Sequence, residues 1–465
     1  METAINVLDV QSICLTKRAY FETGATKSYD FRIQKLKDLK AAIVTHEEAL
    51  FDALYKDLRK SRFEAYTSEI AIIYEEIKFA IKHLEGWMES EPVGTPLVLQ
   101  PAMSRLYYEP KGVVLLISPF NYPFMLLFGP LVGAIAAGNT IVLKPSEVSS
   151  HTEAVILKIT QSAFKNEYIE TILGPGDVVV PQLIKGFDFD HILFTGSTRV
   201  GKEIMRLAAE HLSPVSLELG GKSPAIVHHS AKIKQTAKKI IWGKTYNAGQ
   251  TCVAPDYVLV HESKKDKLIA EMIKQIEKMF GKDAQQSPDF GRLIHKNRFK
   301  AVTAYLKEGK IAYGGRVDEA DFYVEPTLLT DVSFEDSVMR EEIFGPVLPI
   351  ITYSDDSEIL PILRKNPNPL SCYIFTTEAD FESFIIDNFA FGGGCVNNTL
   401  SHLGNPNLPF GGRGASGIGS YHGKFGFDIF SHVKGILKSP SSLDPGLLYP
   451  PYKNRLFKLI KWYIK

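Results

Sequence analysis

The sequence predicts an α/β protein built on two doubly wound, open and mostly parallel sheets. From Lys111 onward, short apolar runs alternate with stretches of helical periodicity, in two successive series. Uniformly apolar runs are typical of parallel strands, because helices cover both faces of such a sheet. With 465 residues, of which 45% are hydrophobic and 23% charged, the chain is long enough for two or three ordinary globular domains.

Residues 27–90 precede the first series and combine many charges with apolar residues at helical spacing, as in FRIQKLKDLKAAIVTHEEALFDAL. We expect a set of amphipathic helices there. A segment punctuated by proline and glycine follows, through EPVGTPL and QPAMSRLYYEPKG, and it has short strand character.

The first series predicts one parallel sheet. Its strands are expected in GVVLLIS, NTIVLKP, YIETIL, DHILFTG and PVSLELGG, and its helices around 124–137, 152–164, 177–185 and 199–212. The stretch from Gly112 to Leu143 carries no charge and is long enough to span a bilayer. Prolines, glycines and asparagines interrupt it, so we interpret it as strand, turn, buried helix and strand.

The second series predicts a second sheet. Its strands are expected in SPAIVHH, DYVLVHES, YVEPTLLTDV, PVLPIITY and LSCYIFTT, with helices over 231–247 and over KKDKLIAEMIKQIEKMF. The segment 391–420 is rich in glycine and predicts tight loops at a crevice.

Charge and cysteine content narrow the class of protein. Lys+Arg and Asp+Glu both number 53, so no net field attracts nucleic acid, and no nucleic-acid partner is expected. The four cysteines, Cys14, Cys252, Cys372 and Cys395, are scattered and lack C-x-x-C spacing, so we expect neither a disulfide framework nor a metal site. A reducing, cytoplasmic location follows, and METAINVLDV is not a secretory signal.

Two motifs lie where strands of the first series end. In FTGSTRVGK (194–202), Gly196 and Gly201 bracket a strand-to-helix turn whose free N–H groups could hold a phosphate; a plain tight turn is the alternative. In LKPSE (143–147), Lys144 and Glu147 follow another strand, at the edge where open α/β sheets bind ligands. There they could hold a ribose, or they could form an exposed ion pair.

Two further segments carry reactive groups. Glu218, in SLELGGKSP, ends an apolar strand, where burial would raise its pKa and suit it to act as a base toward water; a solvated strand end is the alternative. Cys252, in YNAGQTCVAPDY (246–257), is either a buried, inert cysteine or a nucleophile. A helix beginning at Cys252 would favour its thiolate, and the Asn121 amide, in PFNYP, could donate to a developing oxyanion.

Taken together, the motifs identify a family. FNYP, KPSE, FTGSTRVGK, LELGGKSP, GQTCVAPDY, EEIFGPV (341–347) and PFGGRGASGIGSYHGKFGFDIFSH (409–432) occur in this order. This set closely resembles the aldehyde dehydrogenase superfamily. NYPF, GQTCVAPDY, the YHGK run and YPPY (449–452) resemble its class-3 or fatty-aldehyde branch. The resemblance covers roughly residues 30–452.

The resemblance implies three parts and a tail. A Rossmann-like cofactor-binding domain would take residues 1–90 and 112–217, and a catalytic domain residues 218–423. A small β bridging or oligomerisation unit would combine a strand pair from 91–111 with a strand from 424–440, within 424–442. Residues 443–465 would form the tail, and members of this branch are usually homodimers.

The resemblance also implies a role for each matching residue. Cys252 would attack the aldehyde to give a thiohemiacetal and then a thioester, with its own backbone N–H and Asn121 holding the oxyanion. Glu218 would activate the hydrolytic water. The cofactor residues would be Lys144 and Glu147 at the adenosine ribose, Gly196, Ser197 and Gly201 at the pyrophosphate, Glu342 at the nicotinamide ribose and Phe344 near the nicotinamide. NAD would be preferred, with NADP as an alternative.

The expected activity is NAD(P)-dependent oxidation of lipophilic aliphatic or aromatic aldehydes to carboxylic acids. Two alternatives stay open: a CoA-acylating dehydrogenase, against which Glu218 argues, and a catalytically silent protein with the same fold. Two departures from the family pattern, Asn397–Asn398 and Arg413, bear on substrate preference and not on the reaction.

The segment 453–465, KNRLFKLIKWYIK, has five basic residues and no acid. At helical spacing, Leu456, Phe457, Leu459, Ile460, Tyr463 and Ile464 share one face, and Arg455, Lys458, Lys461 and Lys465 share the other. Peripheral membrane contact and docking on a dimer partner are both open interpretations, and the segment is too short to span a bilayer.

Overall fold

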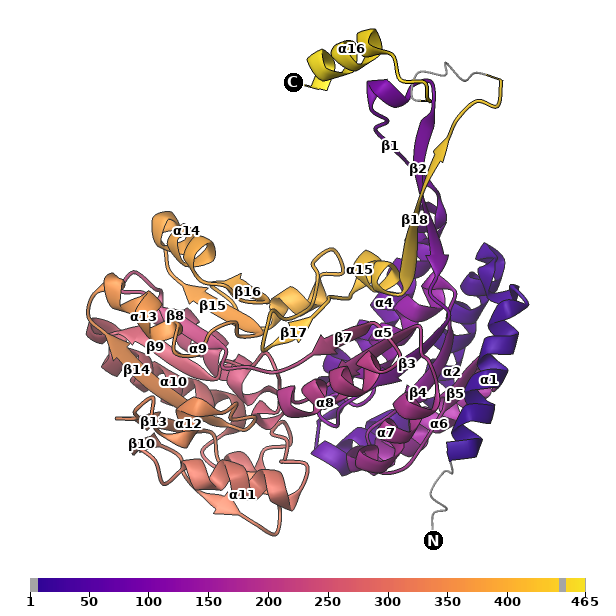
Figure 1. Ribbon diagram of the computed structural model, residues 1–465. Helices are drawn as coiled ribbons and strands as arrows, with labels where there is room; N and C mark the ends of the chain where they lie inside the picture. The colour runs from indigo at the N-terminus through magenta and orange to yellow at the C-terminus, as the bar shows by residue number, and fades with distance from the viewer. Residues whose placement is uncertain (1–6, 443–448, 465) are drawn as a thin grey trace. The chain divides into compact units, whose positions relative to one another are not determined.

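The computed structural model describes residues 7–442 and 449–464, and the chain forms two compact units (Figure 1). The larger unit runs to Trp87 and then from Pro110 to Ser431. The smaller unit consists of Met88–Glu109 and the chain from His432 onward. The division of the larger unit into a cofactor-binding and a catalytic domain stays a prediction.

Helices fill the N-terminal part of the larger unit, and those between residues 27 and 90 agree with the predicted periodicity, whereas the helix over Val7–Glu22 was not predicted. They are α1 (Val7–Glu22), α2 (Tyr29–Leu58), α3 (Arg62–Ala65), a π-helical turn (Tyr66–Ile70) and α4 (Ala71–Met88). The long helix α2 begins at Ser28, whose hydroxyl accepts a hydrogen bond from the backbone of Phe31 (3.2 Å). It ends at Arg59, which has a left-handed backbone (φ 56°) and stops the helix.

The first sheet has the strand order β17-β7-β6-β3-β4-β5. Its strands are β3 (Val113–Ile117), β4 (Thr140–Lys144), β5 (Ile169–Thr171), β6 (His191–Thr195), β7 (Val215–Glu218) and the antiparallel β17 (Gly417–Ile418). Helices α5 (Met125–Ala137), α6 (Ser150–Ala163), α7 (Gly176–Gly186) and α8 (Thr198–Ala209) connect and cover the five parallel strands. The chain order reverses between β3 and β6, and ligands of such sheets bind beyond the carboxyl ends of strands at that point.

The second sheet has the order β10-β13-β14-β9-β8-β15-β16, with only β10 antiparallel to its neighbour. Its strands are β8 (Pro224–Val227), β9 (Tyr257–His261), β10 (Lys310–Tyr313), β13 (Thr327–Thr330), β14 (Val347–Tyr353), β15 (Ser371–Phe375) and β16 (Gly393–Val396). Its order reverses between β8 and β15. The predicted fold class, two doubly wound sheets with a small β unit, is confirmed.

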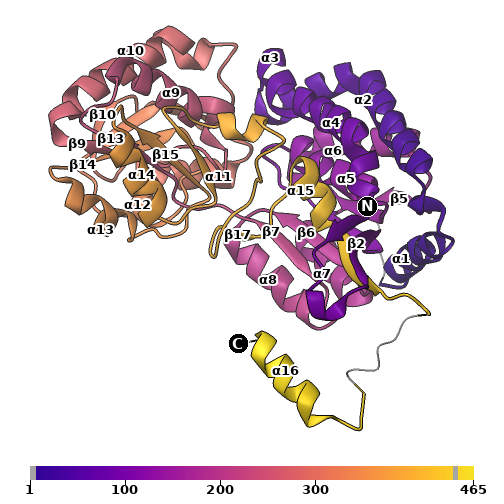
Figure 2. The same cartoon turned by 90° about the horizontal axis from the view of Figure 1, so that it is seen from above.

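Helices accompany this sheet along the chain and are seen around it in Figure 2. They are α9 (Ile233–Thr245), α10 (Lys265–Phe280), α11 (Lys296–Tyr305), α12 (Ser337–Arg340), α13 (Ile359–Leu363) and α14 (Ala379–Asn388), and a short pair β11 (Val317–Asp318) and β12 (Tyr323–Val324) lies between α11 and β13 in the sequence. Two clusters of buried apolar side chains pack against the sheet. Strands β8 and β9 are buried along almost their whole length, which explains their uninterrupted apolar sequence.

The smaller unit is a three-stranded sheet and a helix. Strands β1 (Glu91–Val93), β2 (Met103–Pro110) and β18 (Ser431–Lys438) lie in this order, and α16 (Asn454–Ile464) ends the described chain. The strand expected from residue 424 begins only at Ser431, because Gly423–Ile429 form helix α15. Among the described residues, no helix combines the length and apolar character that crossing a membrane requires.

Candidate active site

Cys252 lies in a tight backbone turn between α9 and β9. Residues Tyr246–Gly249 form a short 3₁₀ segment in which Asn247 (φ 54°) and Ala248 (φ 52°) have left-handed backbones. Gly249 (φ 78°) packs against the backbone of Gly345, where any Cβ would collide. Asn247–Gly249 therefore form a tight turn, which sets the direction in which the following residues run.

The expectation of a helix beginning at Cys252 is wrong. Thr251 and Ala254 close a turn instead (Ala254 N to Thr251 O, 2.9 Å), and the chain then enters β9. Burial, followed by the charges of Glu342 and Glu218, raises the pKa of the Cys252 thiol. Burial and these two acidic side chains therefore both disfavour the thiolate form of Cys252.

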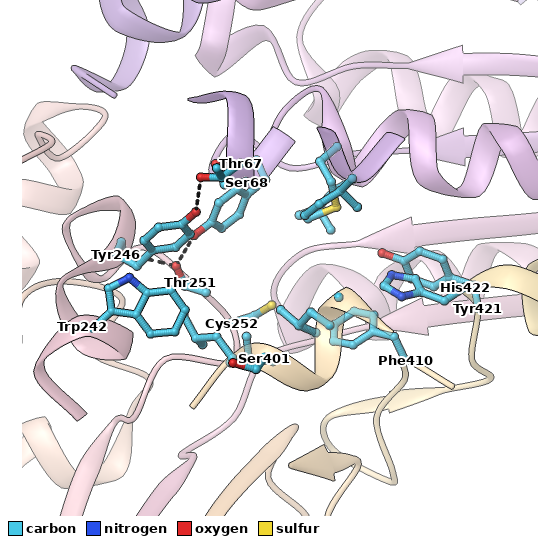
Figure 3. A pocket seen from close by; sticks show the side chains of 18 of the residues that line it. Thr67, Ser68, Trp242, Tyr246, Thr251, Cys252, Ser401, Phe410, Tyr421 and His422 are labelled. Atoms are coloured by element: carbon cyan, nitrogen blue, oxygen red, sulfur yellow. Dashed lines mark hydrogen bonds between the residues drawn. The ribbon is translucent and has the colours of Figure 1, made fainter. Parts of the chain in front are cut away.

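Two cavities meet at Cys252. The larger one, of about 500 Å³, is walled mainly by apolar and aromatic side chains and includes Cys252 (Figure 3). Its walls include Phe63, Tyr122, Trp242, Tyr246, Leu400, Leu403, Phe410 and Tyr421. The smaller one, of about 160 Å³, also includes Cys252, and it combines apolar side chains such as Phe120 and Phe344 with polar and charged ones such as Asn121 and Glu218. Cys252 thus lies between an apolar cavity and a second cavity that also carries polar and charged groups.

Aromatic side chains shape the larger cavity. The hydroxyl of Tyr246 lies 3.1 Å from Thr67 Oγ1, and the hydroxyl of Tyr122 lies 2.6 Å from Thr251 Oγ1 (Figure 3). These bonds satisfy the polar ends of rings whose faces line the cavity. The hydroxyl of Tyr421 has no hydrogen-bond partner in the described part of the chain.

Asn121 is buried (2% exposed) in the turn after β3, and it lines the smaller cavity. One Nδ2–H donates to the carbonyl of Gln250 (2.9 Å), in the turn that carries Cys252. The backbone carbonyl of Asn121 accepts hydrogen bonds from Asn247 Nδ2 (2.8 Å) and Lys60 Nζ (3.0 Å). The amide is therefore tied to the cysteine turn, and its second N–H is available to a ligand.

A buried ion pair positions this asparagine. Lys60 and Glu69 are each at most 1% exposed and form a salt bridge. Glu69 also accepts from the backbone of Phe124 (3.1 Å) and Met125 (3.0 Å) at the start of α5. The pair thus joins the N-terminal helices to the turn that holds Asn121, and the sequence reasoning missed it.

Glu218 ends β7 and is only 2% exposed, so the alternative of a solvated strand end is wrong. Neither carboxylate oxygen has a hydrogen-bond partner among the residues described, although both lie in a wall of the smaller cavity. Burial raises the pKa of Glu218 well above its ordinary value. An unpaired carboxyl group of this kind is suited to take a proton from a molecule inside the cavity.

Glu342 and Phe344 follow α12 and line the same cavity. One Glu342 oxygen has no partner within the described chain, and its carboxylate lies over Gly220, where a Cβ would collide. Burial and then the charge of Asp256 raise the pKa of Glu342 to about 8. Phe344 has a left-handed backbone (φ 49°) and meets the Phe120 ring edge-to-face at 5.8 Å.

A buried charge network holds this loop. Asp256 accepts from the backbone N–H of Ile343 (3.3 Å), and it pairs with Lys222 (2.5 Å) and Lys244 (3.4 Å). Arg298 donates to the Ile343 carbonyl (2.9 Å) from α11. The backbone between Glu342 and Phe344 is therefore fixed through both its N–H and its carbonyl.

The remaining predicted cofactor residues lie at carboxyl ends of the first sheet. Gly196 and Ser197 line the smaller cavity, and Ser197 caps α8. Gly201 does not line it; it lets α8 pack closely on Leu219, because a Cβ there would meet that side chain at 2.7 Å. The strand-turn-helix geometry expected of FTGSTRVGK is thus present.

Lys144 and Glu147 lie at the end of β4, outside the smaller cavity. They pair with each other at 3.1 Å, and Lys144 is 1% exposed, so the pair is not the exposed one that was the alternative. Burial acts to raise the pKa of Glu147, but hydrogen bonds from the Gly176 backbone (2.9 Å) and from Lys144 outweigh it and lower that pKa. Glu147 is therefore a fixed negative charge at this edge.

The structure also brings in residues to which the sequence assigned no role. Thr195, Phe120 and Arg298 line the smaller cavity, and Thr195 Oγ1 and Arg298 Nε are buried without a partner in the described residues. Thr195 lies inside FTGSTRVGK and Phe120 inside PFNYP, so these two motifs could have indicated them. Arg298 comes from a charged helix whose composition does not indicate that it reaches this cavity.

Fold and site together define a class of enzyme. A doubly wound sheet with polar groups at its switch point faces a cysteine carried by a second sheet, and an apolar cavity lies on the other side of that cysteine. The aldehyde dehydrogenase family model matches residues 3–436. The chain belongs to the aldehyde dehydrogenase family, and it is an enzyme that oxidises aldehydes.

Similar proteins agree with this assignment. The chain is 46% identical over 450 residues to 4,4'-diaponeurosporen-aldehyde dehydrogenase of Staphylococcus aureus (96% of this chain, 97% of the relative). It is 40% identical over 445 residues to human aldehyde dehydrogenase family 3 member B1 (95% of each chain). The resemblance to the class-3 branch is confirmed.

Solved structures show the same fold. A substrate-bound structure of Staphylococcus aureus AldH matches with a TM-score of 0.95 at 45% identity, covering 98% of this chain and 99% of that one. An NAD-dependent aldehyde dehydrogenase from Sinorhizobium meliloti matches with a TM-score of 0.85 at 28% identity, covering 94% of this chain and 88% of that one.

Proposed function

We propose that this enzyme oxidises lipophilic aldehydes to carboxylic acids with NAD, through a thioester on Cys252. The observation that carries the proposal is the position of Cys252, which lines both an apolar cavity and a second cavity with unpaired polar and charged groups. An aldehyde can occupy the first while a nicotinamide cofactor occupies the second. We further propose that residues 1–90 and 112–217 bind the cofactor and that residues 218–423 carry the catalytic groups. Residues 91–111 and 424–442 would form a bridging unit, and residues 443–465 a tail.

Cys252 is the proposed nucleophile. Its sulfur adds to the aldehyde carbonyl and forms a thiohemiacetal, while the thiol proton is released to solvent, so that the Glu218 carboxylate stays available for the second half of the reaction. The free N–H of Asn121 and the backbone N–H of Cys252 donate to the oxygen that becomes negative. Because Asn121 is buried and tied to the Gln250 carbonyl, the donor is already oriented before the substrate binds.

The residues of the smaller cavity fit a nicotinamide dinucleotide. Thr195 Oγ1, Arg298 Nε and Glu342 Oε1 are buried without partners in the part of the chain that the structure describes, so a polar ligand would satisfy them. Gly196 and Ser197 would hold its pyrophosphate at the start of α8, Gly201 would allow close packing there, and Glu342 and Phe344 would hold the nicotinamide end. When bound, the nicotinamide accepts the hydride that leaves the thiohemiacetal carbon.

Glu218 completes the reaction as the base for hydrolysis. Its carboxylate takes a proton from water, the resulting hydroxide adds to the thioester carbon, and the sulfur of Cys252 leaves. The products are the carboxylic acid and the free enzyme. The unpaired oxygens of Glu218 support this role, because they are free to hold a water molecule inside the cavity.

We propose that Lys144 and Glu147 hold the adenosine ribose and that the charge of Glu147 favours NAD. Replacing Glu147 with glutamine keeps an acceptor but removes the charge that would repel a 2′-phosphate. We expect the ratio of kcat/KM for NADP to that for NAD to rise about tenfold, or about 1.4 kcal/mol. Initial rates with both cofactors measure this ratio. Glu210→Gln, at the exposed end of α8, is the matched control, and an equal ratio in both variants would contradict the assignment.

The apolar cavity supports a lipophilic substrate. With unbranched alkanals of increasing length, we expect kcat/KM to rise about fourfold for each added methylene until the cavity is full, because each buried methylene contributes about 0.8 kcal/mol. NADH formation and product analysis with and without CoA measure both the rate and the fate of the acyl group. A flat chain-length series contradicts the substrate class, acyl-CoA in place of acid contradicts hydrolysis, and an absence of NADH with every aldehyde supports the silent alternative.

We propose that the enzyme is a cytoplasmic homodimer whose C-terminal helix contacts anionic membrane surfaces. In α16, Phe457 (62% exposed) and Trp462 (77%) are open to solvent beside basic side chains. Lys465, expected on the basic face, lies outside the described residues. Exposed aromatic and basic side chains on one helix are typical of an interfacial membrane helix.

Deleting residues 453–465 tests this contact. We expect the full chain to float with vesicles that contain phosphatidylserine and the truncated chain to stay in solution. Neutral vesicles are the control, because they lack the charge that attracts the basic residues. Light scattering gives the mass of each form. Unchanged flotation of the truncated chain, or its conversion from dimer to monomer, would contradict the membrane role and support docking on the partner.

A further inference from the structure

The carboxyl ends of strands β8 and β15 form an edge of the second sheet that the aldehyde reaction does not use. Cys252 precedes β9 and so lies at the amino end of that strand, whereas the chain order reverses between β8 and β15 at the opposite edge. In doubly wound sheets, ligands bind beyond the carboxyl ends of the strands at this reversal. The backbone of His228 donates to Phe375 there (3.0 Å), so the segments that follow β8 and β15 lie side by side.

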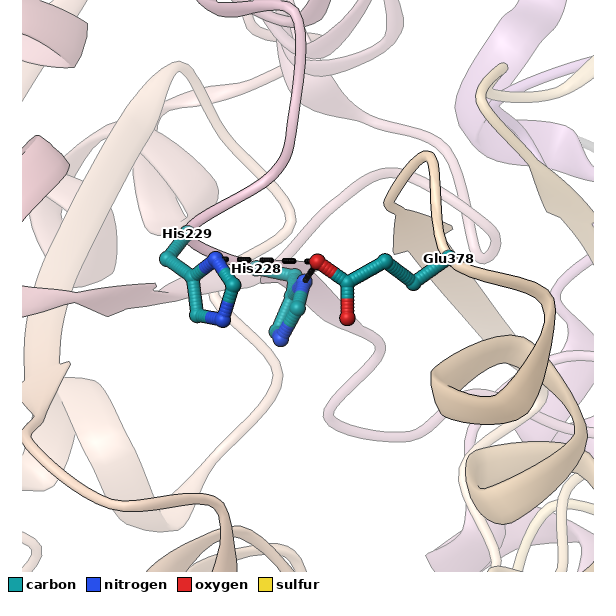
Figure 4. A group of neighbouring side chains, drawn as sticks. All are labelled: His228, His229 and Glu378. Atoms are coloured by element: carbon teal, nitrogen blue, oxygen red, sulfur yellow. Dashed lines mark ion pairs between the residues drawn. The ribbon is translucent and has the colours of Figure 1, made fainter.

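Three side chains of types that can bind a metal ion gather at this edge of the sheet. His228 and His229 follow β8, and Glu378 follows β15 (Figure 4). Glu378 Oε1 lies 3.9 Å from His228 Nδ1 and 3.8 Å from His229 Nδ1. Ligands of a tetrahedral zinc ion are about 3.4 Å apart, as its bond lengths of about 2.1 Å require. The three donor atoms lie within 4.8 Å of one another, so small movements of the half-exposed His229 and Glu378 side chains would bring all three to bonding distance of one ion.

The hydrogen bonds of His228 place a lone pair on Nδ1, the ring nitrogen that lies near Glu378. The backbone N–H of Ser230 donates to His228 Nδ1 (3.4 Å), so this nitrogen carries the lone pair and the proton is on Nε2. His228 Nε2 lies 3.5 Å from the Asp356 carboxylate. A carboxylate behind the second nitrogen of a ligating histidine is a recurrent feature of metal sites, because it fixes the ring and strengthens the ligand.

Neighbouring hydroxyl groups can accommodate the ion. The hydroxyl of Ser230 lies 2.8 Å from His228 Nδ1 and would give up this contact when an ion binds. It keeps Thr376 Oγ1 (3.0 Å) and the backbone N–H of Thr377 (3.0 Å) as partners. The backbone N–H of Ser230 also gives up His228 Nδ1 when an ion binds, but Ser230 is only partly buried, so solvent can take the place of this contact.

We propose that His228, His229 and Glu378 bind a divalent transition-metal ion, of the zinc type, that links the segments after β8 and β15. Two imidazoles and one carboxylate suit zinc, nickel or copper, whereas magnesium and calcium require oxygen ligands. A water molecule would complete the tetrahedron. None of the three residues lines either of the two cavities at Cys252. The sequence predicted no metal site, because Glu378 is far from His228 and His229 in the chain.

Zinc titration of the full chain tests the site. The background is Cys252→Ala, so that the thiol between the two cavities cannot bind the metal. Isothermal titration should show one zinc ion per chain. His229→Ala and Glu378→Ala should each weaken binding at least about 100-fold, and Asp356→Asn about 10- to 100-fold. His229 and Glu378 are about half exposed, so both variants should fold, which circular dichroism checks.

The exposed His432 in the smaller unit provides the matched control, and His432→Ala should bind zinc as the background protein does. Unchanged zinc affinity in both His229→Ala and Glu378→Ala would overturn the proposal, as would an absence of saturable binding. Cys395 and His402 lie 3.4 Å apart and are another pair that could take the ion. Zinc binding that disappears only in Cys395→Ser would place the ion at that pair and overturn the assignment.

Discussion

Cys252→Ala is expected to abolish aldehyde oxidation. Without the sulfur, neither the thiohemiacetal nor the thioester can form, and no other nucleophile lies between the two cavities among the described lining residues. We expect kcat to fall at least about 1000-fold, as it does when other enzymes lose a covalent nucleophile. Stopped-flow measurement of NADH formation, with a medium-chain alkanal, tests both the first turnover and the steady state.

The control for this prediction is Cys395→Ser. Cys395 is a partly exposed cysteine of β16 that lines neither cavity at Cys252, so its loss should leave kcat within about twofold of the parent enzyme, as is usual for a change away from the reacting groups. Titration of NAD binding by fluorescence shows whether Cys252→Ala keeps the cofactor cavity. Normal turnover by a Cys252→Ala enzyme that is folded and binds NAD would remove the thioester mechanism.

Glu218→Gln is expected to separate the two halves of the reaction. Glutamine keeps the shape of the side chain but cannot accept a proton from water, so the thioester forms and then persists. We expect a burst of about one NADH per chain followed by a steady state about 100- to 10,000-fold slower, the range of general-base catalysis. Rapid mixing resolves the burst, and mass spectrometry of quenched enzyme detects the acyl group on Cys252.

The pH dependence gives this prediction a sign. Burial raises the pKa of Glu218, so the group is protonated, and inactive as a base, at pH values where an exposed glutamate is already ionised. The steady-state rate should therefore increase with pH through an apparent pKa above that of an exposed glutamate, and this increase should be absent from Glu218→Gln. Glu325→Gln is the control, because Glu325 is also buried but pairs with Arg316 away from Cys252. Multiple fast turnovers by Glu218→Gln would show that another group activates the water.

Much of the fold could be predicted because each parallel strand is buried on both faces and is therefore an uninterrupted apolar run. The strands around Val113–Ile117 and Tyr257–His261 were predicted almost to the residue. The strand expected from residue 424 begins later, because Gly423–Ile429 form a helix whose Gly426 packs against Gly133 of α5. Glycine disfavours a helix in isolation, and only the close approach of Gly426 to Gly133 explains it.

The candidate site could be predicted in part, since its reactive residues lie in short motifs at strand ends. The surroundings of those residues could not, because they depend on contacts between distant segments. The Lys60–Glu69 pair that anchors Asn121 and the Arg298 side chain in the smaller cavity come from amphipathic helices of ordinary composition. The pKa of Cys252 also depends on such contacts, because burial among distant segments raises it and the charges of Glu342 and Glu218 add to this effect.

The two cavities at Cys252 have a consequence for the order in which substrates bind and products leave. An apolar molecule that fills the larger cavity excludes the aldehyde but leaves the smaller cavity open. A long-chain alcohol or amide should therefore inhibit competitively against aldehyde and non-competitively against nucleotide. The acid can leave through the larger opening while the reduced nucleotide is still bound, so either product can dissociate first, and exchange of one does not require exchange of the other.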